Sequence, residues 1–339
     1  MARDRQNGPE NGYQLPFEKE INGLRRQIEA FEAKQAETGH SYSAEIRQLR
    51  ATYVSLLRNT YQNLTAWQIV QVARHPARPQ ACDYIERIVR DFVEIHGDRR
   101  FADDKAVRCG FGRIGLGAEK IMLLAHHKGK NTKDKIACNF GCAHPEGYRK
   151  ALRAMKLAEK YRLPVVTLID TAGAFPGIGS EERGVAESIA RNMMEMGRLR
   201  TPIVCVVIGE GGSGGAMGIG VGDRVAIMEF AYYSVISPEG CASILWRTGE
   251  KAPEAAEAMK ITARALKGLE VVDDIIPEPL GGAHRNPAEA AGNLEHYVVR
   301  TLRELDRIEI DQLLKHRYER WRRMGKVRNS QLQAAQARK

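Results

Sequence analysis

Hydrophobic residues near the start of the chain recur at helical spacing. From position 17 to position 31 they are separated by alternating steps of four and three, which places them on one face of a helix. A second set with helical spacing follows a break at Gly39. The two sets are Phe17, Ile21, Leu24, Ile28 and Phe31, then Ile46, Leu49, Tyr53, Leu56 and Leu57. The pattern predicts a helical hairpin over 17–64 that packs on its own domain or on a partner, because each arm is short for a free-standing coiled coil.

The segment after the hairpin predicts the start of the main domain. Thr65 and Gln68 have the spacing of a capping box, in which each side chain binds the main-chain amide of the other residue, so a helix begins here. Pro76 ends that helix. Further on, residues 107–114 and 120–127 have the composition of strands and flank a glycine-rich turn, which predicts a β-hairpin.

From Pro145 onward the chain alternates between amphipathic helices and short apolar strands. Apolar strands joined by helices predict a largely parallel sheet covered on both faces, and so an α/β fold class. The expected helices are 145–162, 181–199 with Ser180 as its N-cap, one near 215–221, one that begins after Ser237, 253–266 and most of 287–324. The expected strands are 165–169, 203–208, 225–228, 234–236 and 271–276.

The composition excludes several classes of protein. Of the 339 residues, 43% are hydrophobic and 28% are charged, as in an average globular protein. No apolar run is long enough to span a bilayer, and the polar first residues lack the apolar core of a secretory signal. Six scattered cysteines without a disulfide framework favour a cytoplasmic location. The net charge of +10 fits nucleic acid, membrane headgroups, phosphorylated ligands or an acidic partner, and does not choose between them.

Two glycine-rich loops, 170–179 and 209–218, each follow an apolar strand and precede a helix. The N-terminus of a helix has unpaired N–H groups and a partial positive charge, and glycine lets a ligand approach that backbone closely. Such a loop can bind an anion, or stabilise an oxygen that gains charge during a reaction. Two such loops at successive strand ends indicate a site more strongly than one loop does.

The second loop also fits a dinucleotide-binding pattern. Gly209, Gly211 and Gly214 satisfy G-x-G-x-x-G after a strand, and Glu229 ends the next strand about 20 residues further on. This alternative predicts an NAD-dependent oxidoreductase that uses the 209–214 loop. A nucleotide-binding Walker A loop is excluded, because no Lys-Ser/Thr pair follows Gly214.

A third pattern in the same loop is that of a serine hydrolase. Residues 211–215 satisfy G-x-S-x-G, with Ser213 in the place of the nucleophile. Asp273 or Asp274, followed by His284, would complete a Ser, Asp, His order along the chain. The motif alone leaves this alternative open.

Three other features are interpreted conservatively. Cys138, Cys142 and His144 lie close in sequence, but no fourth ligand is evident, so we expect no metal on this chain. The lysine-rich segment 128–135 is interpreted as a solvated basic loop, with attraction of a phosphorylated ligand or an acidic carrier protein as the alternative. The basic and aromatic residues from Arg317 onward predict a helix that docks on a partner; with no recognisable nucleic-acid-binding module in the sequence, we do not expect that partner to be nucleic acid.

Long strings of residues around the two glycine loops resemble the alpha subunits of bacterial acetyl-CoA carboxylase carboxyltransferase. The strings are 144–152, 169–177, 208–216 and 234–246 (SVISPEGCASILW), with shorter ones at 67–69, 73–76, 97–99 and 276–285. The resemblance runs from about Phe17 to Gly325, which is nearly the whole chain. Uninterrupted strings of this length are far more specific than the short motifs above.

This resemblance implies a crotonase-like fold, a spiral of ββα units with an N-terminal helical hairpin and C-terminal helices. The domains would be a flexible tail (1–16), the hairpin (17–64), the carboxyltransferase domain (65–325) and a basic tail (326–339). The family works as an α₂β₂ assembly with a beta subunit that carries the zinc and most of the CoA site. It transfers the carboxyl group of carboxybiotin, held by the biotin carboxyl carrier protein, to acetyl-CoA. The product is malonyl-CoA, in the committed step of fatty acid synthesis, and biotin carboxylase is a further partner.

The resemblance also implies roles for the two loops. The backbone amides of Gly214, Gly215 and Ala216 would form an oxyanion hole for the ureido oxygen of biotin. The carboxybiotin pocket would be formed by Gly173, Ala174, Phe175, Pro176, Gly177, Gly211 and Gly212. Because biotin's own nitrogen can take the proton of the acetyl methyl group, no side-chain base is expected.

Four residues depart from the family's usual pattern. Ala172 replaces a proline, Phe175 stands where tyrosine is common, and Cys142-Ala143 replace Met-Pro. The missing proline makes the start of the first loop less rigid. These departures concern the biotin pocket and leave the second loop intact.

Overall fold

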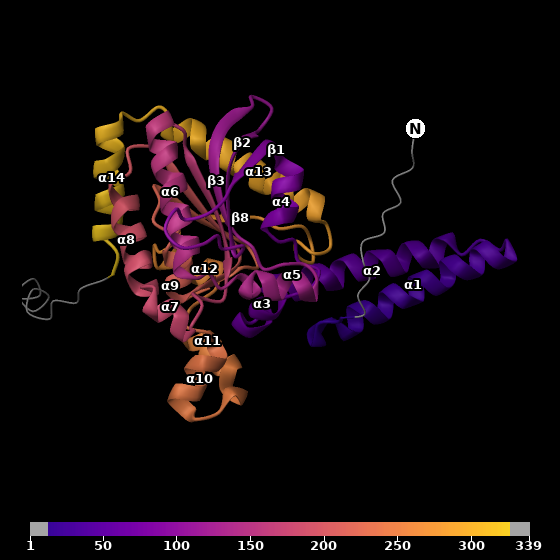
Figure 1. Cartoon of the computed structure of the whole chain (residues 1–339). Coiled ribbons are helices and arrows are strands. Elements are labelled where there is room, and N and C mark those ends of the chain that lie inside the picture. Colours follow the sequence, from indigo (N-terminus) through magenta and orange to yellow (C-terminus); the bar gives the residue numbers. More distant parts are fainter. Residues whose placement is uncertain (1–12, 326–339) are drawn as a thin grey trace, which may run out of the picture.

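The computed structural model describes residues 13–325, which form an α/β fold around one mixed sheet of eight strands (Figure 1). The strands are β1 (Val89–Ile95), β2 (Val107–Ile114), β3 (Glu119–His126), β4 (Val165–Thr171), β5 (Ile203–Gly212), β6 (Arg224–Met228), β7 (Tyr232–Ser234) and β8 (Asp274–Ile276). Their order is β1-β2-β3-β4-β5-β6-β8, and β7 pairs with the last part of β5. The pairs β1–β2 and β2–β3 are antiparallel, and the pairs from β3 onward are parallel.

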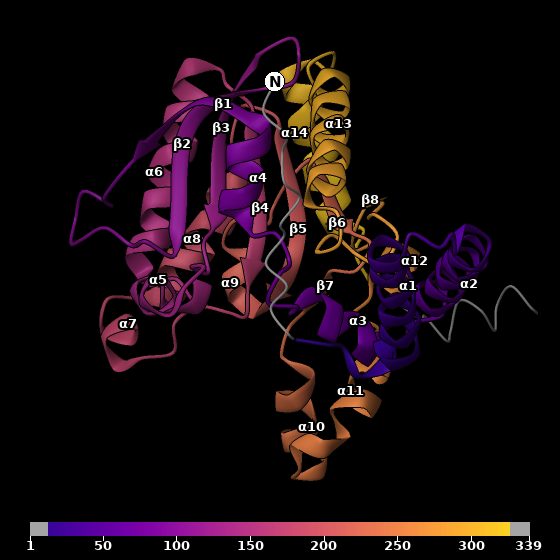
Figure 2. The same cartoon turned by 90° about the vertical axis from the view of Figure 1, so that its right-hand side faces the viewer.

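Helices cover both faces of this sheet (Figure 2). On one face α6 packs on β2 and β3, α8 packs on α6, and α14 packs on α8, while α4 and α13 pack together on the other. The helices are α1 (Lys19–Thr38), α2 (Ser43–Gln62), α3 (Ala66–Ala73), α4 (Ala81–Ile88), α5 (Thr132–Ala137), α6 (Pro145–Tyr161), α7 (Ile178–Glu182), α8 (Val185–Arg198), α9 (Ser213–Met217), α10 (Pro238–Trp246), α11 (Ala252–Ala258), α12 (Ala263–Gly268), α13 (Pro287–Leu305) and α14 (Ile310–Arg322). The covered, largely parallel sheet confirms the predicted α/β class.

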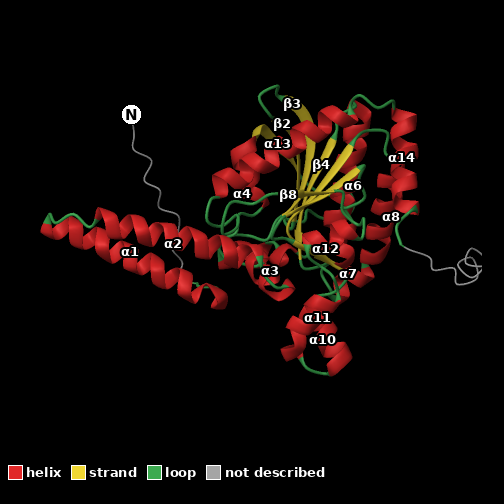
Figure 3. Cartoon of the chain, turned by 180° about the vertical axis from the view of Figure 1, so that it is seen from behind, coloured by secondary structure: helices red, strands yellow, loops and turns green. Residues whose placement is uncertain are grey.

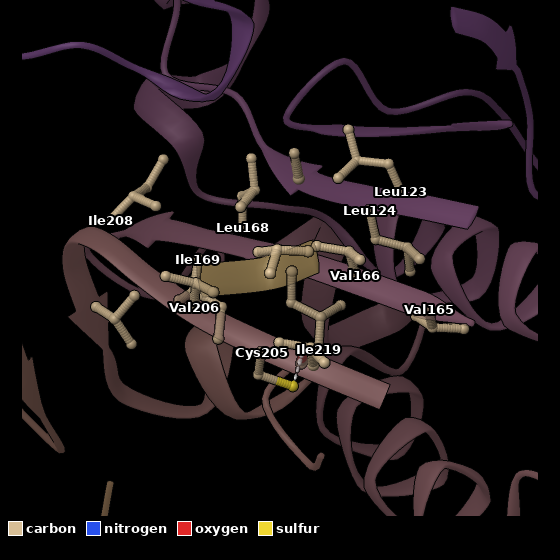
Figure 4. Packing of buried hydrophobic residues seen from close by; sticks show 14 of the residues in the cluster. Leu123, Leu124, Val165, Val166, Leu168, Ile169, Cys205, Val206, Ile208 and Ile219 are labelled. Carbon is tan, nitrogen blue, oxygen red and sulfur yellow. Dashed lines mark hydrogen bonds between the residues drawn. The ribbon is translucent and has the colours of Figure 1, made fainter. Parts of the chain in front are cut away.

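The core lies in the centre of the sheet. Every residue of β4 and of β5 is buried, as expected for strands with helices on both faces. Side chains such as Leu124, Val166 and Val206 pack together across neighbouring strands (Figure 4). The glycine loops are therefore attached to the most rigid part of the molecule.

The predicted helical hairpin is confirmed as α1 and α2, which lie side by side and extend away from the sheet (Figure 3). At its base, Glu18 is 4% exposed and accepts hydrogen bonds from the Tyr61 hydroxyl and the Arg285 guanidinium, both at 2.6 Å. Leu15 and Phe230 join the small apolar cluster at the same place. The hairpin is thus fixed to the main domain by one buried carboxylate and a separate core.

The structure confirms two of the predicted helix caps and the β-hairpin, which depend on residues close together in the sequence. Thr65 and Gln68 form the capping box at the start of α3, with bonds of 3.3 and 2.8 Å. Ser237 caps α10 by accepting from the Gly240 amide at 3.1 Å. The β-hairpin agrees with β2 and β3 to within one residue, but β1 was not predicted.

Three predicted helices need correction, and the strand expected over 234–236 lies two residues earlier, as β7. The helix expected over 181–199 is two helices, α7 and α8, separated at Gly184, whose φ of +77° interrupts the helix. Ser180 is no N-cap, because it lies buried inside α7 with its hydroxyl 2.8 Å from Nδ1 of His144. The helix expected over 253–266 is also two, α11 and α12. The helix expected near 215–221 is the short α9, which begins earlier, at Ser213.

The predicted tails fall mainly outside the described residues. This applies to 1–12 of the N-terminal tail and to the whole of 326–339. Within the described part of the N-terminal segment, Leu15 is 1% exposed. Among residues 13–325, no helix combines the length and the apolar character needed to cross a membrane.

Candidate active site

The two glycine loops lie together at the carboxyl ends of β4 and β5. Gly209, Gly211 and Gly212 belong to β5 itself, and α9 begins directly after them, so the second segment is less of a loop than predicted. Gly214, Gly215 and Ala216 lie in the first turn of α9, whose N-terminus has no side-chain cap. The first N–H groups of a helix have no partner within the helix, so these amides are the donors the site offers.

Two glycines let the loops touch. A Cβ atom on Gly215 would lie 2.5 Å from the carbonyl carbon of Gly173 and 2.7 Å from the amide nitrogen of Ala174. A Cβ on Gly212 would overlap the main chain of Ala172. Only glycine permits this approach of backbone to backbone, which joins the predicted oxyanion residues to the 173–174 part of the predicted pocket.

The first loop is also bound by the segment that precedes α6, on the side away from the second loop. The Thr171 hydroxyl lies 2.7 Å from the carbonyl oxygen of Gly141 and accepts from the Gly173 amide at 3.1 Å. The Phe175 amide donates to the Ala143 carbonyl, and the Phe175 ring packs on His144 with 4.3 Å between ring centroids. Phe175 is thus a structural contact to the start of α6, whereas Pro176 is exposed and Gly177 leads into α7.

A buried group of charges lies beneath both loops. Nζ of Lys128 is 2.7 Å from Oδ1 of Asp170 and 2.6 Å from Oε2 of Glu210. Oε1 of Glu210 accepts from Nε of Arg74 at 2.7 Å and from the Tyr232 hydroxyl at 2.6 Å. Lys128 is therefore not part of a solvated basic loop, and that part of the prediction is wrong.

These groups are held in their charged forms. Burial opposes the ionisation of Glu210, but Lys128 and Arg74 outweigh it and lower the pKa of that carboxyl to about 2. Burial also opposes the charge of Lys128, and Asp170 and Glu210 outweigh it, so the pKa of the ammonium is raised. Paired charges of this kind stay ionised in an interior because their mutual attraction and further hydrogen bonds offset the cost of losing water.

His126, at the end of β3, is a second buried group beside the loops. It is 1% exposed, and neither ring nitrogen has a hydrogen-bond partner among residues 13–325. Burial and then the charge of Lys128 lower the pKa of this imidazole to about 3, against a smaller opposing effect of the Gly215 main chain. The ring is therefore neutral near pH 7. Sequence reasoning missed it, because it sits in an apolar strand with no motif around it.

The hydrolase triad is not assembled. His284 stacks on His75 with 4.0 Å between ring centroids. Asp273 accepts hydrogen bonds from the Val225 amide and from Arg320, and Asp274 accepts one from Tyr297. These partners leave no acid–base pair for Ser213, so the hydrolase alternative is not supported.

The dinucleotide alternative is not supported either. Such a site needs a glycine turn between the strand and a long helix. Gly209 and Gly211 are instead inside β5, and α9 has five residues. Glu229 accepts from the Glu278 amide at 3.3 Å.

The cysteines have structural surroundings. Cys109 and Cys205 are fully buried, and burial raises the pKa of each thiol to about 12. Cys138, Cys142 and His144 belong to no potential metal-binding group of three or more His, Cys, Asp or Glu residues within the part of the chain that the structure describes.

Comparison with known proteins gives one consistent family. Residues 14–325 match the family described as acetyl co-enzyme A carboxylase carboxyltransferase-like. The carboxyltransferase subunit alpha of acetyl-coenzyme A carboxylase from Rhodopirellula baltica is 53% identical over 311 residues, covering 92% of this chain and 97% of that protein. The subunit of the same name from Edwardsiella ictaluri is 51% identical over 314 residues, covering 92% and 98%.

Solved structures agree at the level of the fold. The chain resembles transcarboxylase 12S with a TM-score of 0.51 at 20% identity, covering 66% of this chain and 42% of that one. It resembles the beta subunit of geranyl-CoA carboxylase from P. aeruginosa with a TM-score of 0.52 at 16% identity, covering 73% and 46%. These neighbours are crotonase-fold carboxyltransferases, which confirms the expected fold. The chain belongs to the family of acetyl-CoA carboxylase carboxyltransferase alpha subunits, which are transferases.

Proposed function

We propose that the first turn of α9 is the oxyanion hole of the carboxyl transfer, and that the adjacent first loop receives the biotin group. The donors are the amides of Gly214 and Gly215, with Ala216 behind them. The pocket wall is formed by Gly173, Ala174, Phe175, Pro176, Gly177, Gly211 and Gly212. The observation that carries the proposal is the contact of these two loops at Gly215, where no side chain fits.

The residues present fit a carboxybiotin group. When bound, that group supplies the carboxyl to be transferred and gains negative charge on its ureido oxygen. Backbone N–H groups suit such an oxygen, because they are fixed in place and carry no proton that can be lost. The nearby side chains do not compete for this role, since Asp170 and Glu210 are bound to Lys128, and His126 is neutral and buried.

The chain's own contribution to the chemistry is positioning and charge stabilisation. An oxyanion donor is commonly worth about 10²–10³ in rate. The charged side chains beneath the loops are paired with each other, and the lowered pKa of His126 makes its imidazole a weak base near pH 7. We therefore assign no proton transfer to a side chain of this chain.

We propose a beta subunit in an α₂β₂ assembly as the partner that completes the site, with the zinc on that subunit. The biotin carboxyl carrier protein, charged by biotin carboxylase, would deliver the group to the site. The surface of α10 supports a partner, because Ile244, Leu245 and Trp246 are 72%, 63% and 41% exposed on a helix that stands out from the body (Figure 2). Clustered exposed apolar side chains mark protein contacts.

Native mass spectrometry of the chain purified from its own cells, followed by an assay of malonyl-CoA formation, tests this proposal. We expect equal copies of this chain and a zinc-bearing second subunit, and transfer from carboxybiotin to acetyl-CoA by that complex. A stable complex that forms no malonyl-CoA would contradict the proposed function.

A further inference from the structure

We propose that Lys128 is a positioning residue for the transfer reaction, because it holds together the two strand ends that carry the glycine loops. This inference rests on the proposed function of those loops. Lys128 touches no part of the proposed site directly. It acts through Asp170 and Glu210, and we name these three residues the strand-end cluster.

The cluster joins three neighbouring strands. Lys128 follows the end of β3, Asp170 is the next-to-last residue of β4, and Glu210 lies near the end of β5. Asp170 is followed directly by the first loop, and Glu210 is followed by Gly211, Gly212 and the first turn of α9. A displacement of either carboxylate therefore moves the loop next to it.

The pairing of β4 with β5 is irregular directly before the two loops, so main-chain hydrogen bonds alone do not fix these strand ends. β4 and β5 pair regularly up to Ile169 with Val207, but Thr171 pairs with Gly211, so the register shifts by two residues between these pairs. Asp170 and Glu210 are the residues at this irregularity. The Glu210 amide donates to Oδ1 of Asp170 at 2.9 Å, and a side chain thus replaces the ordinary ladder bond.

Lys128 is needed because its two partners repel each other. One Nζ atom contacts Oδ1 of Asp170 and Oε2 of Glu210, so these two carboxylate oxygens lie close together. Arg74 and the Tyr232 hydroxyl both donate hydrogen bonds to the other oxygen of Glu210 and leave Oε2 to Lys128. Without the ammonium, Asp170 and Glu210 keep only Arg74 as a nearby bound counter-charge, so the two buried carboxylates repel each other and this repulsion acts to separate the strand ends.

The main test is Lys128→Met in the complete complex with its beta subunit. We expect kcat for malonyl-CoA formation to fall about 10²-fold, the effect of a small misplacement of a reacting group, with the KM for acetyl-CoA changed less than about twofold. Lys128→Arg keeps the charge and should recover part of the loss.

A double variant separates charge repulsion from general damage. Asn at position 170 can still accept the Glu210 amide through its carbonyl oxygen, but it carries no charge. We therefore expect Lys128→Met with Asp170→Asn to be more active than Lys128→Met alone. A double variant that is no better than the single one would contradict the repulsion argument.

Arg317→Met is the control, because it breaks a fully buried ion pair at the opposite end of β5 from the loops, where Asp223 also binds the Ile203 amide. Arg317 binds Asp223 through Nε and Nη2 at 2.8 and 2.6 Å. We expect this variant to lower Tm but to keep the kcat of the folded complex. Equal losses of kcat in Lys128→Met and Arg317→Met, or a Lys128→Met variant with wild-type kcat, would overturn the proposal. A wild-type complex without transfer activity would instead refute the proposed function itself.

Discussion

Gly214 and Gly215 are neighbours in the first turn of α9, but their surroundings differ. A Cβ on Gly215 would lie 2.5 Å from the Gly173 main chain, whereas a Cβ on Gly214 would meet only the side chain of Ile189 at 3.6 Å. Gly215→Ala must therefore separate the loops, and we expect kcat to fall at least about 10²-fold. Gly214→Ala keeps its amide and fits, so it is the control and should stay within about threefold of wild type. A fully active, folded Gly215→Ala variant would contradict the oxyanion assignment.

Ser213 separates the backbone site from a serine nucleophile. Its φ of +53° is unusual for a residue other than glycine, but alanine has the same preference there, so Ser213→Ala removes the hydroxyl without a new strain. A site made of backbone amides does not need that hydroxyl. We expect kcat within about threefold of wild type in the malonyl-CoA assay, since a lost nucleophile typically costs several orders of magnitude. Loss of nearly all activity in a folded variant would show that the Ser213 hydroxyl takes part in the transfer and would contradict a site made of backbone amides alone.

Two buried histidines predict acid sensitivity. Burial and Lys128 hold the pKa of His126 at about 3, and burial and His75 hold the pKa of His284 at about 2. In the unfolded chain both titrate near pH 6.5, so below that pH the unfolded state binds protons that the folded state does not. Stability is then lost as pH falls, by about 2 kcal/mol per histidine at pH 5.

Tm measured from pH 7 to pH 5 checks this expectation. The carboxylates with lowered pKa, such as Glu210, lose their contribution only at lower pH, so they do not explain a loss in this window. His284→Gln should reduce the fall in Tm relative to wild type. Parallel curves of Tm against pH for the two proteins would show that His284 takes up no proton on unfolding between pH 7 and pH 5.

At the scale of elements, the Glu18 carboxylate is the buried polar contact that, together with a small apolar core, fixes the helical hairpin to the main domain. Glu18→Ala leaves the Arg285 cation buried without its partner, which costs about 3–5 kcal/mol. We expect a lower Tm and faster proteolytic cleavage of α1 and α2. Glu32→Ala is the control on the same hairpin, because Glu32 and Arg50 form an exposed pair worth less than about 1 kcal/mol. Equal changes of Tm and of cleavage rate in the two variants would mean that the contact of Glu18 with Arg285 does not fix the hairpin to the main domain.

The elements show where sequence reasoning succeeds. Caps, turns and apolar periodicity act over a few residues, and they predicted the hairpin, the start of α3 and the buried strands β4 and β5. The break at Gly184 was missed, because a single glycine inside a helical segment does not by itself predict the positive φ that separates α7 from α8. The extension of β5 through Gly212 was missed for a different reason. Glycine weakens a strand locally, and here pairing with Thr171 and with β7 overrides that preference.

The candidate site also depends on contacts between residues that are distant in the sequence, which local patterns do not predict. The glycine loops were found from local patterns, but their contact depends on residues about 40 positions apart, such as Gly173 and Gly215. Lys128 was placed in a solvated loop, because its partners Asp170 and Glu210 come from other strands. Arg317 was expected on a docking surface and is instead buried against Asp223. A charged side chain acquires its role from tertiary contacts, which spacing along the chain does not encode.

At the scale of the whole molecule, the groups of the candidate site are all attached to one edge of the buried sheet. The parallel strands bring their carboxyl ends to one edge, where the strand-end cluster, His126 and both loops meet. The hairpin and α10 stand out from the body on the outside (Figure 1). Two fixed loops beside protruding helices suit the proposed role, in which another chain completes the site.

The charge of the whole chain predicts how that reaction responds to salt. The net charge is +10, and residues 326–339 contribute four basic and no acidic side chains. If the basic chain attracts an acidic carrier, kcat/KM for carrier-bound carboxybiotin falls as salt rises from about 0.05 to about 0.3 M, with kcat unchanged, because screening weakens only the long-range attraction. A chain that ends at Gly325 should show a smaller salt dependence and the same kcat. An identical kcat/KM at all salt concentrations would contradict steering, and a lower kcat in the shortened chain would place the tail in the chemistry instead.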